Sequence, residues 1–207
     1  MHTPKNYRNE NIDEIHDFIK HNSFGILINQ VDGKPWATHI PLVLDKNEEG
    51  SSVLVGHISR ANPQWKEFQN NEQVMVIFSG PHTYISPSWY DHENVPTWNY
   101  LAVHVYGTIK IMEGESLYNA LAKLVDKYEV HSERPVSVHT MSQEMVRKEM
   151  KGVVGFEISM DEVQATYKLS QNRDKHNHTL IIEELEKKGE ANATEIANEM
   201  RKRVPEK

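Results

Sequence analysis

The stretch Phe24–Leu44, FGILINQVDGKPWATHIPLVL, decides the fold. Its first part, Phe24–Asn29, is a short apolar run that is typical of a strand. The residues Val31–Lys34 (VDGK) supply the chemistry of a hairpin turn, and Trp36–Leu44 returns as the second strand. The stretch therefore predicts a β-hairpin.

The same patterning continues along the chain. After a polar, acidic turn at Asp45–Gly50, further strands are expected at Val53–Ile58, Val74–Phe78, Leu101–Ile111, Val153–Met160 and Ala165–Leu169. Between two of these strands, Gly80–Thr97 is rich in proline and is expected to be irregular. Many strands joined by short turns favour a β-barrel over a parallel α/β sheet, so the fold class is mainly β with added helices.

Helices are expected at the N-terminus and in the second half. Apolar residues at three- and four-residue steps predict helices at Ile12–Lys20, at Leu117–Tyr128 with Ser116 as its N-cap, and at Met141–Lys151. Leu180–Arg203 is expected to be helical with a break at Gly189. We expect a barrel domain over residues 1–175 and a helical extension over residues 176–207.

The last segment also resembles the first two helices of a helix-turn-helix. The chain stops at Lys207, which leaves no room for a recognition helix, and acidic residues punctuate both halves. We therefore expect a helical hairpin that packs on the body of the protein or on a partner.

Composition excludes several classes of function. The 207 residues carry 23 Lys and Arg against 30 Asp and Glu, a net charge of −7, which argues against a general nucleic-acid coat but leaves a local basic patch open. The absence of cysteine excludes disulfides, thiolate nucleophiles and thiolate-bound metals. No apolar run is long enough for a membrane span and the N-terminus is not a secretory signal, so we expect a cytoplasmic protein.

The segment His57–Trp65, HISRANPQW, is the most informative local motif. A strand ends here and a helix begins, with Asn62 as N-cap and Pro63 at the first helical position. A helix N-terminus attracts phosphate, and Ser59 and Arg60 add a hydroxyl and a guanidinium. The motif predicts a phosphate cradle, and the alternative is an ordinary capped helix with a surface arginine.

A second motif, Phe78–Tyr90, interleaves small, hydroxylic and aromatic residues. Such a loop can offer donors and an aromatic wall to a flat cofactor, or it can simply be packed by its own aromatic rings.

Two shorter segments offer further ligand contacts. Trp98 and Asn99 could give a flat ring a stacking surface and an amide edge, or they could seal the end of the barrel. The segment Tyr167–Arg173 ends a strand with a cluster of donors, and its alternative is a solvated strand end.

Metal and nucleotide motifs are missing. The twelve histidines show no closed ligand spacing, so no metal site is expected. The sequence also contains no G-x-S-x-G elbow, Walker A loop or G-x-G-x-x-G motif.

Five long motifs together resemble one family. They are HISRANPQW from His57, FSGPHTYISPSWY from Phe78, VPTWNYLAVHVYG from Val95, GVVGFEI from Gly152 and KLSQNR from Lys168. These motifs resemble the PaiB family, the FMN-binding negative transcriptional regulators of sporulation and degradative-enzyme genes in spore-forming bacteria. The resemblance runs from Pro4 through the C-terminal segment.

The resemblance implies an FMN-binding split β-barrel, commonly a homodimer with flavin sites where the subunits meet. The positions that would contact FMN, matched motif by motif, are His57, Ser59, Arg60, Asn62, Ser79, Tyr84, Ile85, Ser86, Trp98, Asn99, Gln171 and Arg173.

Three functions stay open at this point. The resemblance implies a negative regulator, acting on DNA directly, through a small patch such as Arg201–Arg203, or indirectly. The alternative is an FMN-dependent oxidoreductase or flavin carrier, since flavin can carry out hydride chemistry without a committed acid or base. A third reading is a barrel without cofactor that acts by protein–protein contact.

Overall fold

The computed structural model describes residues 1–70 and 73–205, and its chain divides into two compact units. Unit 1 comprises Met1–Phe18, Ser79–Val103 and Gln164–Lys207, and unit 2 comprises Ile19–Phe78 and His104–Val163. Each unit is described by itself below.

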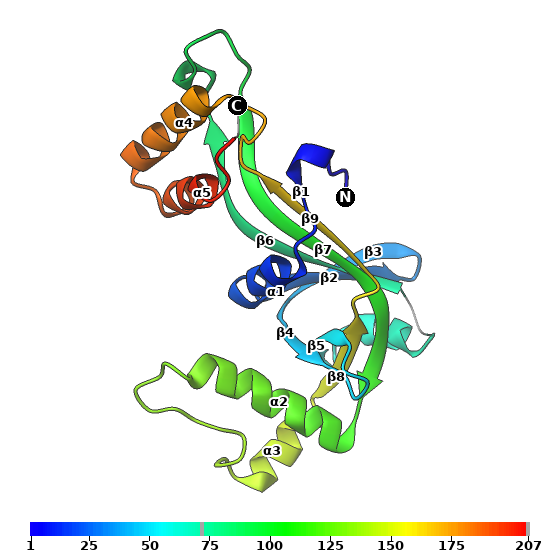
Figure 1. Cartoon of the computed structure of the whole chain (residues 1–207). Helices are drawn as coiled ribbons and strands as arrows, with labels where there is room; N and C mark the ends of the chain where they lie inside the picture. Colours follow the sequence, from blue (N-terminus) through cyan, green and yellow to red (C-terminus); the bar gives the residue numbers. More distant parts are fainter. Residues whose placement is uncertain (71–72, 206–207) are drawn as a thin grey trace. The chain divides into compact units, whose positions relative to one another are not determined.

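Antiparallel strands dominate the fold. In the described residues these are β1 (Arg8–Asn9), β2 (Phe24–Val31), β3 (Lys34–Pro41), β4 (Val43–Lys46), β5 (Ser52–Ser59), β6 (Gln73–Ile85), β7 (Thr97–Met112), β8 (Val153–Ser159) and β9 (Glu162–Lys168). The strand order is β3-β2-β6-β7-β8-β5-β4, with β9 paired to β7 and β1 (Figure 1). No ladder in the described chain joins β3 to β4, so the sheet is not closed. The predicted mainly β fold with added helices is confirmed.

The helices fall into the expected regions. They are α1 (Ile12–His21), α2 (Gly114–Glu129), α3 (Gln143–Met150), α4 (Lys175–Lys188) and α5 (Ala191–Arg201), with 3₁₀ helices η1 (Lys5–Tyr7), η2 (Pro63–Asn70) and η3 (Pro87–Trp89). In the part of the chain that the structure describes, no helix is long and apolar enough to cross a membrane.

The first predicted hairpin is confirmed. β2 and β3 pair from Phe24↔Pro41 to Val31↔Lys34, and the turn residues Asp32 and Gly33 both have positive φ, 51° and 74°. Two consecutive positive φ angles define the type I′ turn that suits the twist of a hairpin. The second strand, predicted as one piece, is divided at Leu42, whose N–H donates to Ser23 O at 2.8 Å instead of continuing the β2–β3 ladder.

Gly107 in β7 lies close to the main chain of Ser159. A Cβ at this position would lie 1.7 Å from the carbonyl oxygen of Ser159. The neighbouring Thr108 N–H donates to Ser159 Oγ at 2.9 Å. Only glycine lets the two main chains pass at this point.

The predicted irregular stretch Gly80–Thr97 is wrong at its start, where residues 80–85 continue β6. β6 continues to Ile85 and β7 begins at Thr97, because the inward-facing positions continue to be buried beyond Phe78. Gly80 carries no side chain where the Phe18 ring lies, since a Cβ would come within 2.5 Å of that ring. The glycine and proline of this segment locally favour a turn, but packing against α1 keeps the segment in a strand.

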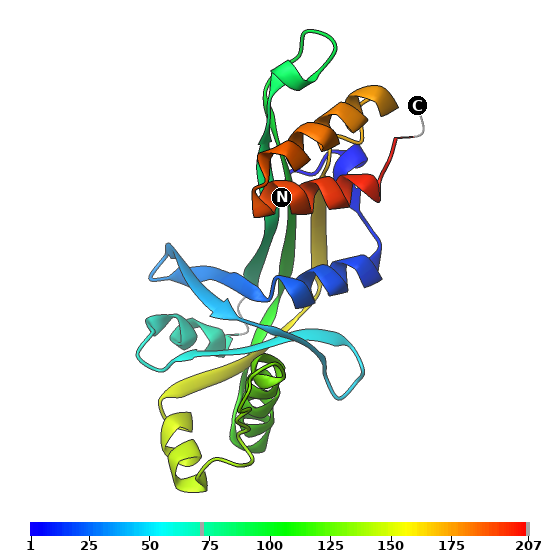
Figure 2. The same cartoon turned by 90° about the vertical axis from the view of Figure 1, so that its left-hand side faces the viewer.

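The start of α2 also differs from the prediction. The sequence predicts Ser116 as the N-cap, but the helix begins three residues earlier, at Gly114 after the N-cap Glu113. Gly114, the first helical residue, has φ 57°, a conformation that glycine adopts without strain. α2 and α3 lie near each other in both views (Figures 1 and 2), and a small core of Ala122, Val138 and Val146 is buried there.

The C-terminal helical hairpin is confirmed, with its break at Gly189. Gly189 caps α4 in the left-handed conformation, φ 65°, and α5 runs back beside α4 (Figure 2). Apolar side chains such as Ile181, Leu185 and Ile196 are fully buried. Both helices belong to unit 1 together with parts of the sheet, and the domain boundary at residue 175 stays a prediction.

Candidate functional site

Unit 2 contains a pocket of about 390 Å³ where β5 ends and β8 begins. Three of the positions predicted to contact FMN line it, His57, Ser59 and Asn62. Thr38 from β3 and Val153 from β8 also line the pocket. Ligand pockets in proteins usually have volumes of roughly 300–1,000 Å³, so this one has the size of a small-molecule site.

The β5–β8 ladder sets the two walls of the pocket. His57 pairs with Gly155 and Ser59 pairs with Val153, so the end of one strand lies beside the start of the other. Burial lowers the pKa of His57 below its usual value, because a charged imidazole loses hydration there. His57 therefore offers the pocket a neutral ring at neutral pH.

Asn62 is the predicted N-cap, and the structure confirms it. Its Oδ1 accepts a hydrogen bond from Gln64 N at 3.1 Å, and its Nδ2 donates to Thr38 Oγ1 at 2.9 Å. The Thr38 hydroxyl donates in turn to Gln64 Oε1 at 2.6 Å. The amide of Asn62 thus joins η2 to β3, and the exposed hydroxyl of Ser59 is the more accessible polar group.

Arg60 lies outside the lining of the pocket. Its Nε donates to Lys151 O and its Nη2 donates to Val153 O, both at 3.0 Å, while its backbone N–H donates to Gly152 O at 2.8 Å. Its guanidinium also lies 5.6 Å from the Trp65 ring centroid. These bonds hold the start of β8, which forms one wall of the pocket. A contact between Arg60 and a phosphate stays a prediction.

The motif predicted as a loop places its residues on both faces of β6 in unit 1. Tyr84 is 39% exposed and lies edge-on to Trp98, which is 53% exposed, with 6.1 Å between ring centroids. Ser79 is also exposed. Ile85 is fully buried in the core, and the Ser86 hydroxyl caps η3 by accepting from Ser88 N. Of these residues, Tyr84 and Trp98 present an aromatic surface.

Asn99 lies on the opposite face of β7 from Trp98. It is fully buried and donates to Ser170 Oγ at 2.9 Å. The Asn99 amide is used within unit 1, and a contact between Asn99 and FMN stays a prediction.

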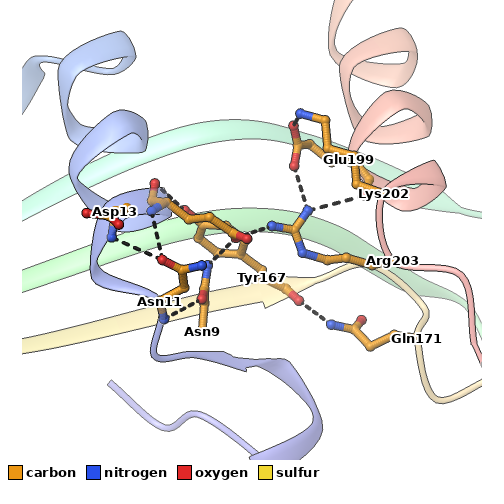
Figure 3. A network of polar contacts seen from close by, with 9 residues as sticks. Asn9, Asn11, Asp13, Tyr167, Gln171, Glu199, Lys202 and Arg203 are labelled. Atoms are coloured by element: carbon orange, nitrogen blue, oxygen red, sulfur yellow. Dashed lines mark hydrogen bonds and ion pairs between the residues drawn. The ribbon is translucent and has the colours of Figure 1, made fainter.

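Gln171 follows β9, and its side chain bonds to the main chain at the end of that strand. Its Nε2 donates to Tyr167 O at 2.6 Å (Figure 3), and its Oε1 accepts from Leu169 N at 2.7 Å. Arg173 lies apart from it, with Nη2 donating to Asn94 Oδ1 at 3.3 Å and the guanidinium 5.1 Å from the Tyr90 ring centroid. Of the twelve positions predicted to contact FMN, four therefore lie in unit 2 and eight lie in unit 1.

The basic run Arg201–Arg203 is paired with carboxylates. Arg201 contacts Glu186, Lys202 contacts Glu199 at 2.6 Å, and Arg203 contacts Glu199 at 2.7 Å and Glu14 at 2.5 Å (Figure 3). Paired cations attract a polyanion less than free ones do, so the local patch considered from the sequence has little net positive charge.

The sequence did not single out Thr38, Gln64 or the start of β8 as parts of the pocket. Gln64 is inside the quoted HISRANPQW motif, so its position next to the cap was the available signal. Val153 is inside the quoted GVVGFEI motif but far from His57 in the sequence, and no local pattern marks Thr38.

Comparison with known proteins identifies the family. Residues 1–162 match the family model described as "Putative FMN-binding domain". The chain is 43% identical to the protease synthase and sporulation protein PAI 2 of Bacillus subtilis. The match covers 97% of this chain and 96% of the relative. The chain belongs to the PaiB family. An uncharacterized protein of Emericella nidulans is 28% identical across 91% of this chain and 92% of its own length.

Solved structures place this PaiB-family chain among the split-barrel proteins. A flavocytochrome of Azotobacter vinelandii matches 80% of this chain and 72% of its own, with a TM-score of 0.60 and 15% identity. The FAD and heme binding protein of Mycobacterium smegmatis matches 78% of this chain and 73% of its own, with a TM-score of 0.59 and 14% identity. The predicted split β-barrel fold and the FMN-binding family are both confirmed.

Proposed function

We propose that this PaiB-family protein binds FMN in the unit 2 pocket and acts as a repressor of protease-synthesis and sporulation genes. The observation that carries the proposal is the pocket at the end of β5, which lies within the residues matched by the FMN-binding model and is lined by His57, Ser59 and Asn62. The regulatory role is taken from the name of the Bacillus subtilis relative.

The chemistry of the lining fits a flavin nucleotide. Ile40 and Ile58 supply apolar surface of the kind that packs against a flat ring, while Ser59 and Thr38 supply hydroxyls. The Ser59 hydroxyl would donate to the phosphate, and neutral His57 would donate or accept one hydrogen bond. When bound, FMN can accept and release electrons.

The exposed aromatic pair of unit 1 supports a homodimer. Tyr84 and Trp98 stay exposed on a sheet face, and aromatic rings of this kind are enriched in protein interfaces. We propose that a second copy of the chain covers them, and that Tyr84 and Trp98 contact FMN in that assembly.

We infer that repression does not depend on the basic run Arg201–Arg203, because its cations are paired with Glu14, Glu186 and Glu199. The second candidate function is an FMN-dependent oxidoreductase. Neutral His57 in the pocket favours it, since an uncharged imidazole can act as a general base and accept a proton from a substrate.

Flavin absorbance during FMN titration tests the proposal. Ser59→Ala should weaken FMN binding about tenfold, since it removes a hydrogen bond to a charged phosphate. The matched control is Ser51→Ala, which removes an exposed hydroxyl in the turn before β5 and should leave FMN affinity unchanged. Absence of FMN binding by the unmodified protein would contradict the proposal.

Two further assays separate the candidate functions. Oxidation of NAD(P)H by the FMN-loaded protein supports the oxidoreductase. Salt-sensitive, sequence-selective retardation of DNA supports a repressor that contacts DNA directly.

A further inference from the structure

We propose that unit 1 contains a separate binding site for the phosphate group of a small molecule. The site is formed by side chains from five segments of the chain, which are Tyr7, Tyr90, Thr97, Lys168 and Arg173. Arg173 is one of the positions that the family resemblance assigns to FMN, but none of the five residues lines the unit 2 pocket, so the inference does not rest on flavin binding there.

Contacts within unit 1 join the five side chains in two groups, one around Lys168 and one formed by Arg173 and Tyr90. Lys168 Nζ donates to the Thr97 hydroxyl and lies 5.9 Å from the Tyr7 ring centroid. The Arg173 guanidinium lies 5.1 Å from the Tyr90 ring centroid. Burial raises the pKa of Tyr7 and the charge of Arg173 partly opposes this, so the two groups interact electrostatically.

Lys168 and Arg173 form an uncompensated pair of positive charges. Both are half-buried, and burial followed by the charge of Arg173 lowers the pKa of Lys168. Among the described residues neither cation has a carboxylate within ion-pair distance, in contrast to Arg201–Arg203. Two like charges held together in a partly dehydrated place repel each other, and a bound anion removes that repulsion.

The nearest carboxylates in the sequence are engaged elsewhere. Asp91 accepts from Asn177 Nδ2 at 2.9 Å and contacts His92 at 2.7 Å. Asp174 caps α4 by accepting from Asn177 N at 2.9 Å. Both carboxylates keep their charge in these contacts, but among the described residues neither forms an ion pair with Lys168 or Arg173.

Tyr90 gives an independent indication of a ligand. Its side chain is only 8% exposed, and its hydroxyl is buried with no hydrogen-bond partner. A buried hydroxyl without a partner costs free energy, so such groups are nearly always satisfied in native proteins. A phosphate oxygen between Arg173 and Lys168 would accept from this hydroxyl.

The donor set favours phosphate over other anions. Every polar group of the site can donate, and the two cations together carry the charge that balances a phosphate dianion. A carboxylate would neutralise only one of them. The guanidinium can also hold two phosphate oxygens at once.

Calorimetric titration of the full-length protein with inorganic phosphate, at constant ionic strength, tests the inference. Arg173→Gln should weaken phosphate binding by about tenfold or more, and Tyr90→Phe should weaken it severalfold. Lys34→Gln removes an exposed lysine from the β2–β3 turn, with the same change in net charge, and should leave the affinity unchanged. Acetate in place of phosphate should bind at least about tenfold more weakly.

Phosphate affinity equal in all of these proteins would overturn the proposal. So would loss of phosphate binding in Ser59→Ala alone, because the anion would then occupy the unit 2 pocket.

Urea unfolding in phosphate-free buffer adds a readout that separates a ligand site from a structural cluster. Tyr90→Phe should not lower stability there, since its hydroxyl has no partner to lose, and phosphate should stabilise the unmodified protein more than the variant. A Tyr90→Phe protein that is less stable without phosphate would show that the hydroxyl serves the fold, and the inference would fail.

Discussion

Asn99 and Ser170 hold each other inside unit 1. Asn99 Nδ2 donates to Ser170 Oγ at 2.9 Å, and the Ser170 hydroxyl donates to Asn99 Oδ1 at 3.1 Å. Ser170 has φ 59°, a left-handed conformation that is uncommon for a residue other than glycine. The buried asparagine thus fixes the turn that leads from β9 toward α4.

Replacing Asn99 with alanine is expected to destabilise the protein. The change leaves the Ser170 hydroxyl buried without its partner, which should lower the free energy of unfolding by about 1–3 kcal/mol. Urea unfolding measures the effect. Trp98→Ala, at the exposed neighbouring position, is the control and should change stability far less. Weaker FMN binding by Asn99→Ala with unchanged stability would instead favour a direct flavin contact.

The sequence correctly predicted those turns and helix ends that depend on the conformation of one or two neighbouring residues. The β2–β3 turn needs two residues that accept positive φ, and Asp32 and Gly33 provide them. Gly189 likewise marks the end of α4. The length of β6 was missed because its reason is not local, since Gly80 and Pro81 signal a turn until the Phe18 ring packs over them.

In the unit 2 pocket, too, the sequence predicted the local contacts and missed the long-range ones. The cap by Asn62 depends on Gln64, two residues away, and could be read from the motif. Arg60 bonds to Lys151 and Val153, residues 91 and 93 positions along the chain, so its positioning role needed the fold.

Arg60→Ala provides a test of that positioning role. If the guanidinium acts by holding the start of β8, its loss should weaken the binding of FMN and of riboflavin, which lacks the phosphate, by the same factor. A factor of about ten corresponds to about 1.4 kcal/mol, the scale of one hydrogen bond to a charged group. Fluorescence titration with both ligands measures it, and Arg147→Ala, an exposed arginine of α3, is the control. A loss confined to FMN would show that Arg60 contacts the phosphate.

Tyr167 makes the stability of the protein sensitive to alkaline pH. Burial raises the pKa of its hydroxyl from 10.0 to about 12, while Arg203 partly opposes the shift. Between these two values the unfolded chain loses a proton that the folded chain keeps, so stability should fall as pH rises through this range, by about 1.4 kcal/mol per pH unit. Below pH 10 the contribution is constant.

Urea unfolding between pH 9 and pH 12 checks this expectation. Tyr167→Phe should reduce the slope of the unfolding free energy against pH by the contribution of one proton. Tyr128→Phe, at a half-exposed position, should leave that slope unchanged. An alkaline slope that Tyr167→Phe does not alter would refute the assignment.

Two glycines should respond differently to alanine, because different atoms stand in the way of the new methyl group. At Gly80 the obstacle is the side chain of Phe18, 2.5 Å from the added Cβ, and a ring can move. At Gly107 the obstacle is the main-chain oxygen of Ser159, 1.7 Å from the added Cβ, and the strands cannot separate without losing the hydrogen bond from Thr108 N.

We expect Gly80→Ala to cost about 1–3 kcal/mol of unfolding free energy, a typical penalty for overpacking. Adding Phe18→Leu to Gly80→Ala should recover part of this loss, since the smaller side chain makes room. Gly107→Ala should cost more than Gly80→Ala and should not be improved by Phe18→Leu. Urea unfolding of the four variants measures these differences, and equal destabilisation by the two glycine replacements would contradict the close approach of β7 to Ser159.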